Sequence, residues 1–283
     1  MNRKQGAVIG LVVVLMGLLF SLDIKGLVKN ESGKEGQQAS EAAVEGSLVT
    51  VVTLESVSES SKQTLNASLS QEITELENQL QSADNSEKLS LQKKLATKWL
   101  DVNQPAPGAF YYEMQALSTN NYADWLKSGD LFTEAYQGTK DTLSQPGLIQ
   151  KAIETYQKAL KLQPQSLDAK TGLGVAYVSG TPNPMQGITL LLGVVKEDPK
   201  NSKANMNLGL FSMKSGQYDK AINRFKTVIE VSPTPDAWFY LASAYENTGE
   251  KDKAITAYEK SKELAADPAL STYVDRKVQE LKK

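Results

Sequence analysis

A sequence pattern that recurs about every 34 residues, from about residue 89 onward, constrains the fold of this chain more than any other feature. Ala221 and Ala254 are separated by about one such period, and so are Pro199 and Pro233. A pair of helices of this length leaves an apolar face that only a neighbouring pair can bury, so several pairs must stack. The pattern therefore predicts an all-α solenoid of about five helix-turn-helix units.

The residues inside each period follow a fixed order. The last unit shows it most completely, as Trp238-x2-Leu241-Ala242-x2-Tyr245 and then Ala254-x3-Tyr258. The four earlier units show parts of the same order. Going back along the chain, the fourth unit has Leu208-Gly209, Ala221-x3-Phe225 and Pro233, and the third has Leu173-Gly174-x2-Tyr177, Gly187-x3-Leu191 and Pro199. The second has Trp125-x2-Ser128-Gly129-x2-Phe132, Ala152-x3-Tyr156 and Pro164, and the first has Leu95-Ala96-x2-Trp99 and Gly108-x3-Tyr112. This order resembles the tetratricopeptide repeat (TPR) family. The resemblance implies a right-handed superhelix of antiparallel helix pairs with a concave groove.

The register of the pattern divides the C-terminal part of the chain into an array and two flanking helices. We expect the array at 88–268, with units at about 88–121, 122–166, 167–201, 202–234 and 235–268. Residues 61–87 are expected to form an N-terminal helix that packs on the repeats, and 269–283 a C-terminal capping helix. Gly216 and Gly249 mark the turn inside the last two pairs. The second unit has extra residues, including 138–147, which must loop out or lengthen its first helix.

A stripe of aliphatic residues precedes the array. Leu65, Leu69, Ile73, Leu76 and Leu80 recur at spacings of three and four, which predicts one amphipathic helix. The helix is expected to cap the N-terminal end of the repeat stack. A short coiled-coil dimer is the alternative interpretation of the same stripe.

The N-terminal segment has the features of a membrane anchor. Residues 6–22 are apolar except for glycines and one serine, and they follow Arg3 and Lys4. A run of this length is at the lower edge of what spans a bilayer, and no small-x-small cleavage site follows it directly. We therefore expect a transmembrane signal anchor at 6–24, preceded by a cytoplasmic tail at 1–5, rather than a cleaved signal peptide. The basic start favours a single-pass protein of the bacterial inner membrane, with the TPR domain in the periplasm or outside.

The segment between the anchor and the stripe is expected to be a flexible linker at 25–60. Residues 30–47 are rich in Glu, Gly, Gln, Ser and Ala, a composition that cannot bury a core. Residues 47–57 are more apolar and β-branched, which favours an ordered connector over a strand, because an isolated strand would need a partner. Residues 48–54 are also apolar enough to fold back into the groove.

The composition excludes several classes of function. The chain has no cysteine and no histidine, so disulfides, thiolate nucleophiles, Cys/His zinc sites and Ser-His-Asp triads are impossible. The formal net charge of -2 argues against nucleic acid as a partner. Neither glycine-rich nucleotide motif, G-x-x-x-x-G-K-[ST] or G-x-G-x-x-G, occurs. We expect a protein that is not an enzyme and that needs no cofactor and no metal.

The resemblance also implies which residues line the groove, since in this family the first helix of each repeat faces it. The register selects Leu126, Thr171, Val175, Val178, Met206, Leu210, Met213 and Phe239 as the candidate binding residues, and it also places Asp130, Ser243 and Glu246 on the same side. Exposed apolar side chains of this kind favour an apolar helix or an extended segment of a partner protein as the ligand, although neighbouring repeats could cover some of them. Lys203 matches one position of the family's carboxylate clamp, but Leu210, Thr171 and Val175 stand where the polar members would be, so we expect no clamp.

Together these features predict a non-enzymatic, membrane-anchored TPR scaffold that binds partner proteins. The architecture is similar to that of bacterial envelope TPR proteins, including the ancillary chaperone subunit of the Sec translocon. It favours an accessory or co-chaperone-like subunit of a cell-envelope complex, such as a protein translocation or secretion machine. The alternative is a self-associating structural spacer, or an assembly factor for another membrane complex.

Overall fold

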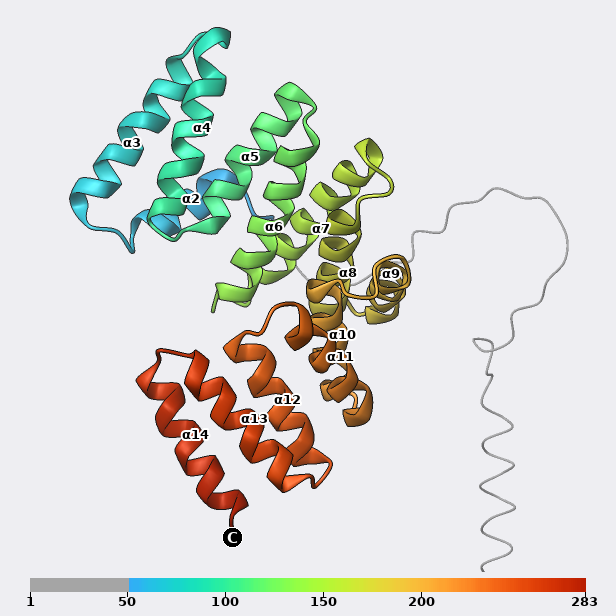
Figure 1. Ribbon diagram of the computed structural model, residues 1–283. Coiled ribbons are helices and arrows are strands. Elements are labelled where there is room, and N and C mark those ends of the chain that lie inside the picture. Colours follow the sequence, from blue (N-terminus) through green and yellow to red (C-terminus); the bar gives the residue numbers. More distant parts are fainter. Residues whose placement is uncertain (1–50) are drawn as a thin grey trace, which may run out of the picture. The chain divides into compact units, whose positions relative to one another are not determined.

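The computed structural model describes residues 51–283, which form helices joined by short turns (Figure 1). The described residues contain 13 helices and no strand. The helices are α2 (Leu54–Lys62), α3 (Ala67–Ser82), α4 (Asn85–Asp101), α5 (Pro105–Thr119), α6 (Tyr122–Gly138), α7 (Gln145–Leu162), α8 (Leu167–Gly180), α9 (Pro184–Glu197), α10 (Ser202–Lys214), α11 (Tyr218–Val231), α12 (Pro235–Asn247), α13 (Lys251–Leu264) and α14 (Pro268–Leu281). The expected all-α TPR solenoid is thus the architecture of this part of the chain.

The helices stack in chain order as antiparallel pairs. The pairs are α4–α5, α6–α7, α8–α9, α10–α11 and α12–α13. The last four lie within the ranges expected for the repeats, whereas α4 begins at Asn85, before the expected start at 88. Each second helix also packs on the first helix of the next pair, and α14 packs on α13 at the C-terminal end. Figure 1 shows this succession from the α3–α4 hairpin to α14.

Turn and cap residues explain where the helices end. Gly216 follows α10 with φ of 70°, and Gly249 follows α12 with φ of 78°. These values lie in the left-handed region that glycine adopts without steric cost, as expected for the turn inside a pair. Ser166 caps α8 and Thr234 caps α12, because each side chain accepts a hydrogen bond from the backbone N–H three residues later.

Small residues on the first helices give large side chains of the second helices room to approach. A Cβ on Gly209 would lie 2.5 Å from the Phe225 ring, and a Cβ on Gly174 would lie 2.9 Å from Leu191. Both partner side chains are fully buried. The small residue in the repeat pattern therefore sets the distance between the two helices of a pair.

The second pair takes up its extra residues mainly in longer helices, and a longer first helix was one of the two outcomes expected from the sequence. Residues 138–147 are not one loop: α6 extends to Gly138 and α7 begins at Gln145, so only 139–144 connect them. Pro146 lies in the first turn of α7, where its fixed φ suits a helix and its missing N–H costs nothing. Both helices of this pair are longer than those of the next pair.

The end of the expected linker is also ordered, which corrects the range 25–60. Residues 54–62 form α2, which begins with a capping box between Thr53 and Ser56. Val52 is buried in the cluster that contains Phe110, Phe132 and Leu148. The physical reason is apolar burial, since this short segment is the apolar part of the expected linker.

The aliphatic stripe of α3 packs inside the chain. Ile73 is fully buried with Leu95, Trp99 and Tyr111, and the leucines at 65, 76 and 80 pack against this cluster. Glu77 of α3 accepts hydrogen bonds from Ser58 of α2 (2.7 Å), from Tyr111 of α5 (3.3 Å) and from Lys62 of α2. The stripe therefore packs against α4 and α5, which suits the expected cap on the repeats.

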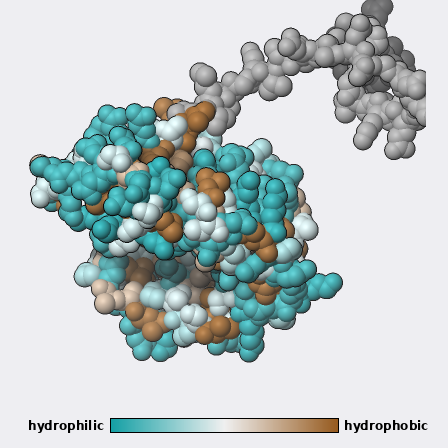
Figure 2. All heavy atoms as spheres, turned by 90° about the horizontal axis from the view of Figure 1, so that it is seen from above, coloured by the Kyte–Doolittle hydropathy of each residue, from teal (hydrophilic) through white to brown (hydrophobic). Residues whose placement is uncertain are grey.

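The expected tail at 1–5, the anchor at 6–24 and the linker up to residue 50 lie outside the described residues. Within 51–283, no helix has the length and apolar character needed to cross a membrane. The face drawn in Figure 2 is mostly hydrophilic, with separate hydrophobic patches.

Candidate partner-binding groove

A cleft of about 350 Å³ lies among the first helices of three consecutive repeats. Its lining comes from α6, α8 and α10, with one residue from α7. The lining residues are Asp130, Thr133, Glu134, Gln137, Tyr156, Gly172, Val175, Lys203, Met206, Asn207 and Leu210. We call this the inner cleft. Three of the eight residues expected in the groove, Val175, Met206 and Leu210, line it.

Tyr156 reaches the inner cleft from the second helix α7 by passing between two glycines. A Cβ on Gly129 of α6 would lie 2.8 Å from the ring, and a Cβ on Gly172 of α8 would lie 2.3 Å from it. Any side chain at Gly172 would occupy the space of the tyrosine ring. Gly129 belongs to the repeat pattern, but Gly172 does not, and sequence reasoning missed it.

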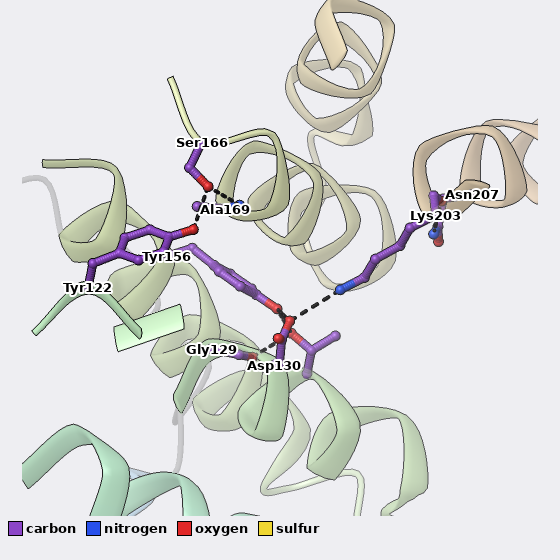
Figure 3. Close-up of polar contacts among 9 residues, drawn as sticks. Tyr122, Gly129, Asp130, Tyr156, Ser166, Ala169, Lys203 and Asn207 are labelled. Carbon is purple, nitrogen blue, oxygen red and sulfur yellow. Dashed lines mark hydrogen bonds and ion pairs between the residues drawn. The ribbon is translucent and has the colours of Figure 1, made fainter. Parts of the chain in front are cut away.

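Asp130 is the polar centre of the inner cleft, as Figure 3 shows. Its carboxylate accepts a hydrogen bond from the Tyr156 hydroxyl (2.8 Å), and it forms an ion pair with the Lys203 ammonium (3.2 Å). Burial and the neighbouring Asp130 charge raise the pKa of Tyr156, so this hydroxyl stays protonated and donates. The group joins α6, α7 and α10, which belong to two non-adjacent repeats.

The ion pair gives Lys203 a partner inside the chain. The side chains of Lys203 and Asp130 are 54% and 38% exposed, so the pair is accessible from the cleft. A clamp for a terminal carboxylate would need this ammonium together with other polar groups. Val175, Met206 and Leu210 are the apolar neighbours that line the same cleft instead.

The other expected groove residues are less exposed than the repeat register suggests. Thr171 and Val175 are buried, at 1% and 4% exposure, so neighbouring helices cover them, which is the alternative that the sequence left open. Val175 lies in the cluster with Ile188 and Leu191. The reason is that α8 is flanked by α6 and α10, whose side chains meet across it through the Asp130–Lys203 pair.

The remaining six residues, Phe239 included, are partly buried. Leu126 packs against two core clusters near α6 and α7, and Val178 packs against the cluster of α9 and α10. Met206, Leu210 and Met213 pack against the C-terminal cluster. This leaves Met206 and Leu210 as the expected residues that combine partial exposure with a place in the inner cleft.

Phe239 belongs to the packing of the last repeat. Its ring lies 5.5 Å from the Tyr258 ring and 5.7 Å from the Tyr273 ring, measured between centroids. A contact of this kind stabilises the stack of α12, α13 and α14. Sequence reasoning grouped Phe239 with Met206 and Leu210 as a ligand surface, but it does not line the inner cleft.

A second group of tyrosine, carboxylate and lysine ties α14 to the last repeat. Glu246 accepts hydrogen bonds from Tyr258 (2.8 Å) and Lys277 (2.8 Å). Burial acts to raise the pKa of Glu246, but the hydrogen bonds from Lys277 and Tyr258 outweigh it and lower this pKa. The repeat register placed Glu246 on the groove side, whereas its hydrogen bonds hold α14 against the last repeat.

No set of three or more acidic residues in the described part of the chain is arranged to hold a metal ion. The polar side chains that contact one another in the inner cleft are those of Asp130, Thr133, Tyr156 and Lys203. Glu134, Gln137 and Asn207 add further polar groups to the lining, and Val175, Met206 and Leu210 supply its apolar surface. This arrangement suits contact with a polypeptide segment.

Comparison with known proteins identifies the repeats. Two TPR family models match residues 141–166 and 212–270. The chain is similar to the BBSome complex member bbs-4 of Caenorhabditis elegans, with 31% identity over 81 residues, which is 29% of this chain and 17% of that protein. The chain thus matches less than a quarter of the length of the curated relatives.

Solved structures show the same fold. A TPR protein from Parabacteroides merdae superposes with a TM-score of 0.55 at 18% identity, covering 81% of this chain and 86% of that one. A thermophilic TPR protein from Thermus thermophilus gives a TM-score of 0.52 at 18% identity, covering 66% and 97%. Neither family model describes a catalytic domain. The chain therefore contains tetratricopeptide repeats, arranged as an all-helical TPR solenoid.

Proposed function

We propose that this protein is a non-enzymatic scaffold that holds a segment of a partner protein in the inner cleft. The observation that carries the proposal is the composition of that cleft. Met206 and Leu210 on α10 present apolar surface, while Asp130 and Glu134 on α6 present carboxylates. Such a cleft favours an apolar helix or an extended segment that also carries a polar or basic residue.

The second part of the proposal is the membrane location. We infer that residues 6–24 anchor the chain in a bacterial inner membrane, with the repeats in the periplasm or outside. Its support is the apolar run that follows Arg3 and Lys4. A tethered protein-binding array suits an accessory or co-chaperone-like subunit of a membrane complex, such as a translocation or secretion machine.

The cleft is tested by affinity purification of the full-length chain from its native membrane in mild detergent, followed by mass spectrometry. The double variant Met206→Glu with Leu210→Glu should lose the co-purifying partner, because two carboxylates would have to be buried against it. Leu162→Glu is the matched control, since Leu162 is a surface leucine of α7, 36% exposed, outside the cleft.

Circular dichroism establishes that both variants remain helical. Equal recovery of the same partner by the folded double variant and by the wild type would refute the assignment of the cleft. Extraction of the full-length chain from membranes by alkaline carbonate would refute the anchor without affecting the cleft.

A further inference from the structure

A second groove lies on the other side of α10, between the second helices of two repeats. Its volume is about 460 Å³. Met185, Ile188 and Leu192 of α9 form one wall, α11 forms the other, and Leu208 and Phe211 of α10 lie at its base. We call this the outer groove. It shares no residue with the inner cleft.

The outer groove is elongated along the helices. α9 packs on α8 and α10, whereas α11 packs on α10 and α12, so the two walls are separate helices. Met185 and Leu192 are two helical turns apart, a distance of about 10 Å along the axis. Lys220 and Thr227 define the same length on the opposite wall. A groove of this length accommodates about two turns of a helix.

The α9 wall presents apolar side chains to solvent. Met185 is 61% exposed and Leu192 is 46% exposed, and both lie on one face of the helix. α9 carries no charged residue before Lys196. A solvated helix face of a globular protein ordinarily carries charged or polar residues. An uncharged face with exposed methionine and leucine is typical of a binding surface.

The α11 wall is basic. Lys220 and Arg224 line the groove one turn apart, and no carboxylate lines it. Lys220 donates to the Gln217 amide oxygen (2.6 Å) and Arg224 donates to the Asn205 amide oxygen (2.9 Å). None of the ion pairs within 51–283 involves either cation. Carboxylates would form stronger, charge-assisted hydrogen bonds with them than these amides do.

From these features we propose that the outer groove binds an amphipathic helix of a partner protein whose polar edge is acidic. The apolar residues of that helix, at positions i, i+3 or i+4, and i+7, pack between Met185, Leu192 and Phe211. Its Asp or Glu side chains face Lys220 and Arg224. This site is independent of the inner cleft, so one TPR array holds two protein segments on opposite sides of α10.

The test uses a phage-displayed library of 14-residue helical peptides, selected on the full-length chain in detergent. Binders are counter-selected on the variant Leu192→Glu. We expect the recovered peptides to combine an apolar stripe with Asp or Glu on one edge. Their affinity, measured by fluorescence polarisation, should fall at least tenfold in Leu192→Glu and in the double variant Lys220→Glu with Arg224→Glu. Replacing the acidic residues of a peptide by lysine should restore binding to that double variant.

Two control variants establish that the peptides bind in the outer groove. Leu264→Glu changes a leucine of α13 with a matched exposure of 47%, and it should leave affinity unchanged. Met206→Glu in the inner cleft should also leave it unchanged. Recovery of no peptide that depends on Leu192, or of peptides without acidic residues, would overturn the proposal. A concentration-dependent dimer that Leu192→Glu abolishes would also overturn the proposal, because the occupant of the outer groove would then be a second copy of the chain.

Discussion

The substitution Gly172→Ala is the sharpest test of how the inner cleft is built. The added Cβ would lie 2.3 Å from two atoms of the Tyr156 ring, whereas ordinary contacts begin at 3.4 Å. The ring would have to withdraw by about 1 Å into a close-packed interior. It cannot do so freely, because it is only 1% exposed and the backbone of Gly129 borders it on α6.

Three effects determine how much Gly172→Ala changes the free energy of unfolding. Alanine in a helix is more favourable than glycine by about 0.5–1 kcal/mol. Overpacking a buried site costs about 1–3 kcal/mol. Displacing the Tyr156 hydroxyl from the Asp130 carboxylate removes a hydrogen bond to a charged group, worth about 1.5–3 kcal/mol. The net expectation is that Gly172→Ala lowers the free energy of unfolding by about 2–5 kcal/mol.

The assay is urea denaturation followed by circular dichroism, with Gly193→Ala as the matched control. Gly193 also lies inside a helix, α9, and its Cβ would meet nothing within 4 Å. The control should therefore raise stability by about 0.5–1 kcal/mol. Tyr156→Leu combined with Gly172→Ala should be less destabilised than the sum of the two single variants. If Gly172→Ala is as stable as Gly193→Ala, the close packing of Tyr156 against α8 is wrong.

Two further predictions concern the ends of the array. Glu246→Gln should remove the ion pair with Lys277 and lower the free energy of unfolding by about 0.5–1 kcal/mol at neutral pH. Because the folded pKa of Glu246 is lowered from its ordinary 4.5, the wild type keeps this contribution above that pH and loses it on acidification below it. The difference in Tm between the two proteins should therefore shrink below pH 4.5, and a constant difference would contradict the pairing. Ile73→Ala should lower the free energy of unfolding by about 2–5 kcal/mol. Because repeat stacks unfold in segments, amide hydrogen exchange should become faster in α3 but not in α12, and equal changes in both helices would contradict this.

The sequence predicted the helix pairs well because the repeat pattern is local. Each unit carries its own small residue, its own aromatic residue and its own turn, so the register of one pair does not depend on distant contacts. For the extra residues of the second pair, which include Gly138 and Gly147, the pattern left two outcomes open, a loop or a longer first helix. Glycine favours turns, but Gly138 is the last residue of α6 and Gly147 lies in the first turns of α7, beside Pro146.

The lining of the groove was harder to predict because exposure on a first helix depends on its neighbours. Val175 of α8 and Met206 and Leu210 of α10, which the register selected, line the inner cleft, whereas the other five selected residues do not. The register could not show that Thr171 is buried, since that depends on how closely α6 and α10 approach α8. Asp130 and Lys203 both stood at groove positions in the sequence, and a carboxylate and a lysine two repeats apart are the signal that could have indicated their pairing.

The polar centre of the inner cleft depends on two glycines. Gly129 and Gly172 leave space for the Tyr156 ring, and the ring carries its hydroxyl to Asp130. Asp130, held in this way, lies where the Lys203 ammonium can reach it from α10. The ion pair spans the first helices on both sides of α8, and the residues of α8 beneath it are enclosed. A partner that brings its own basic residue to Asp130 would therefore compete with Lys203, and its binding in the inner cleft would have to break this ion pair.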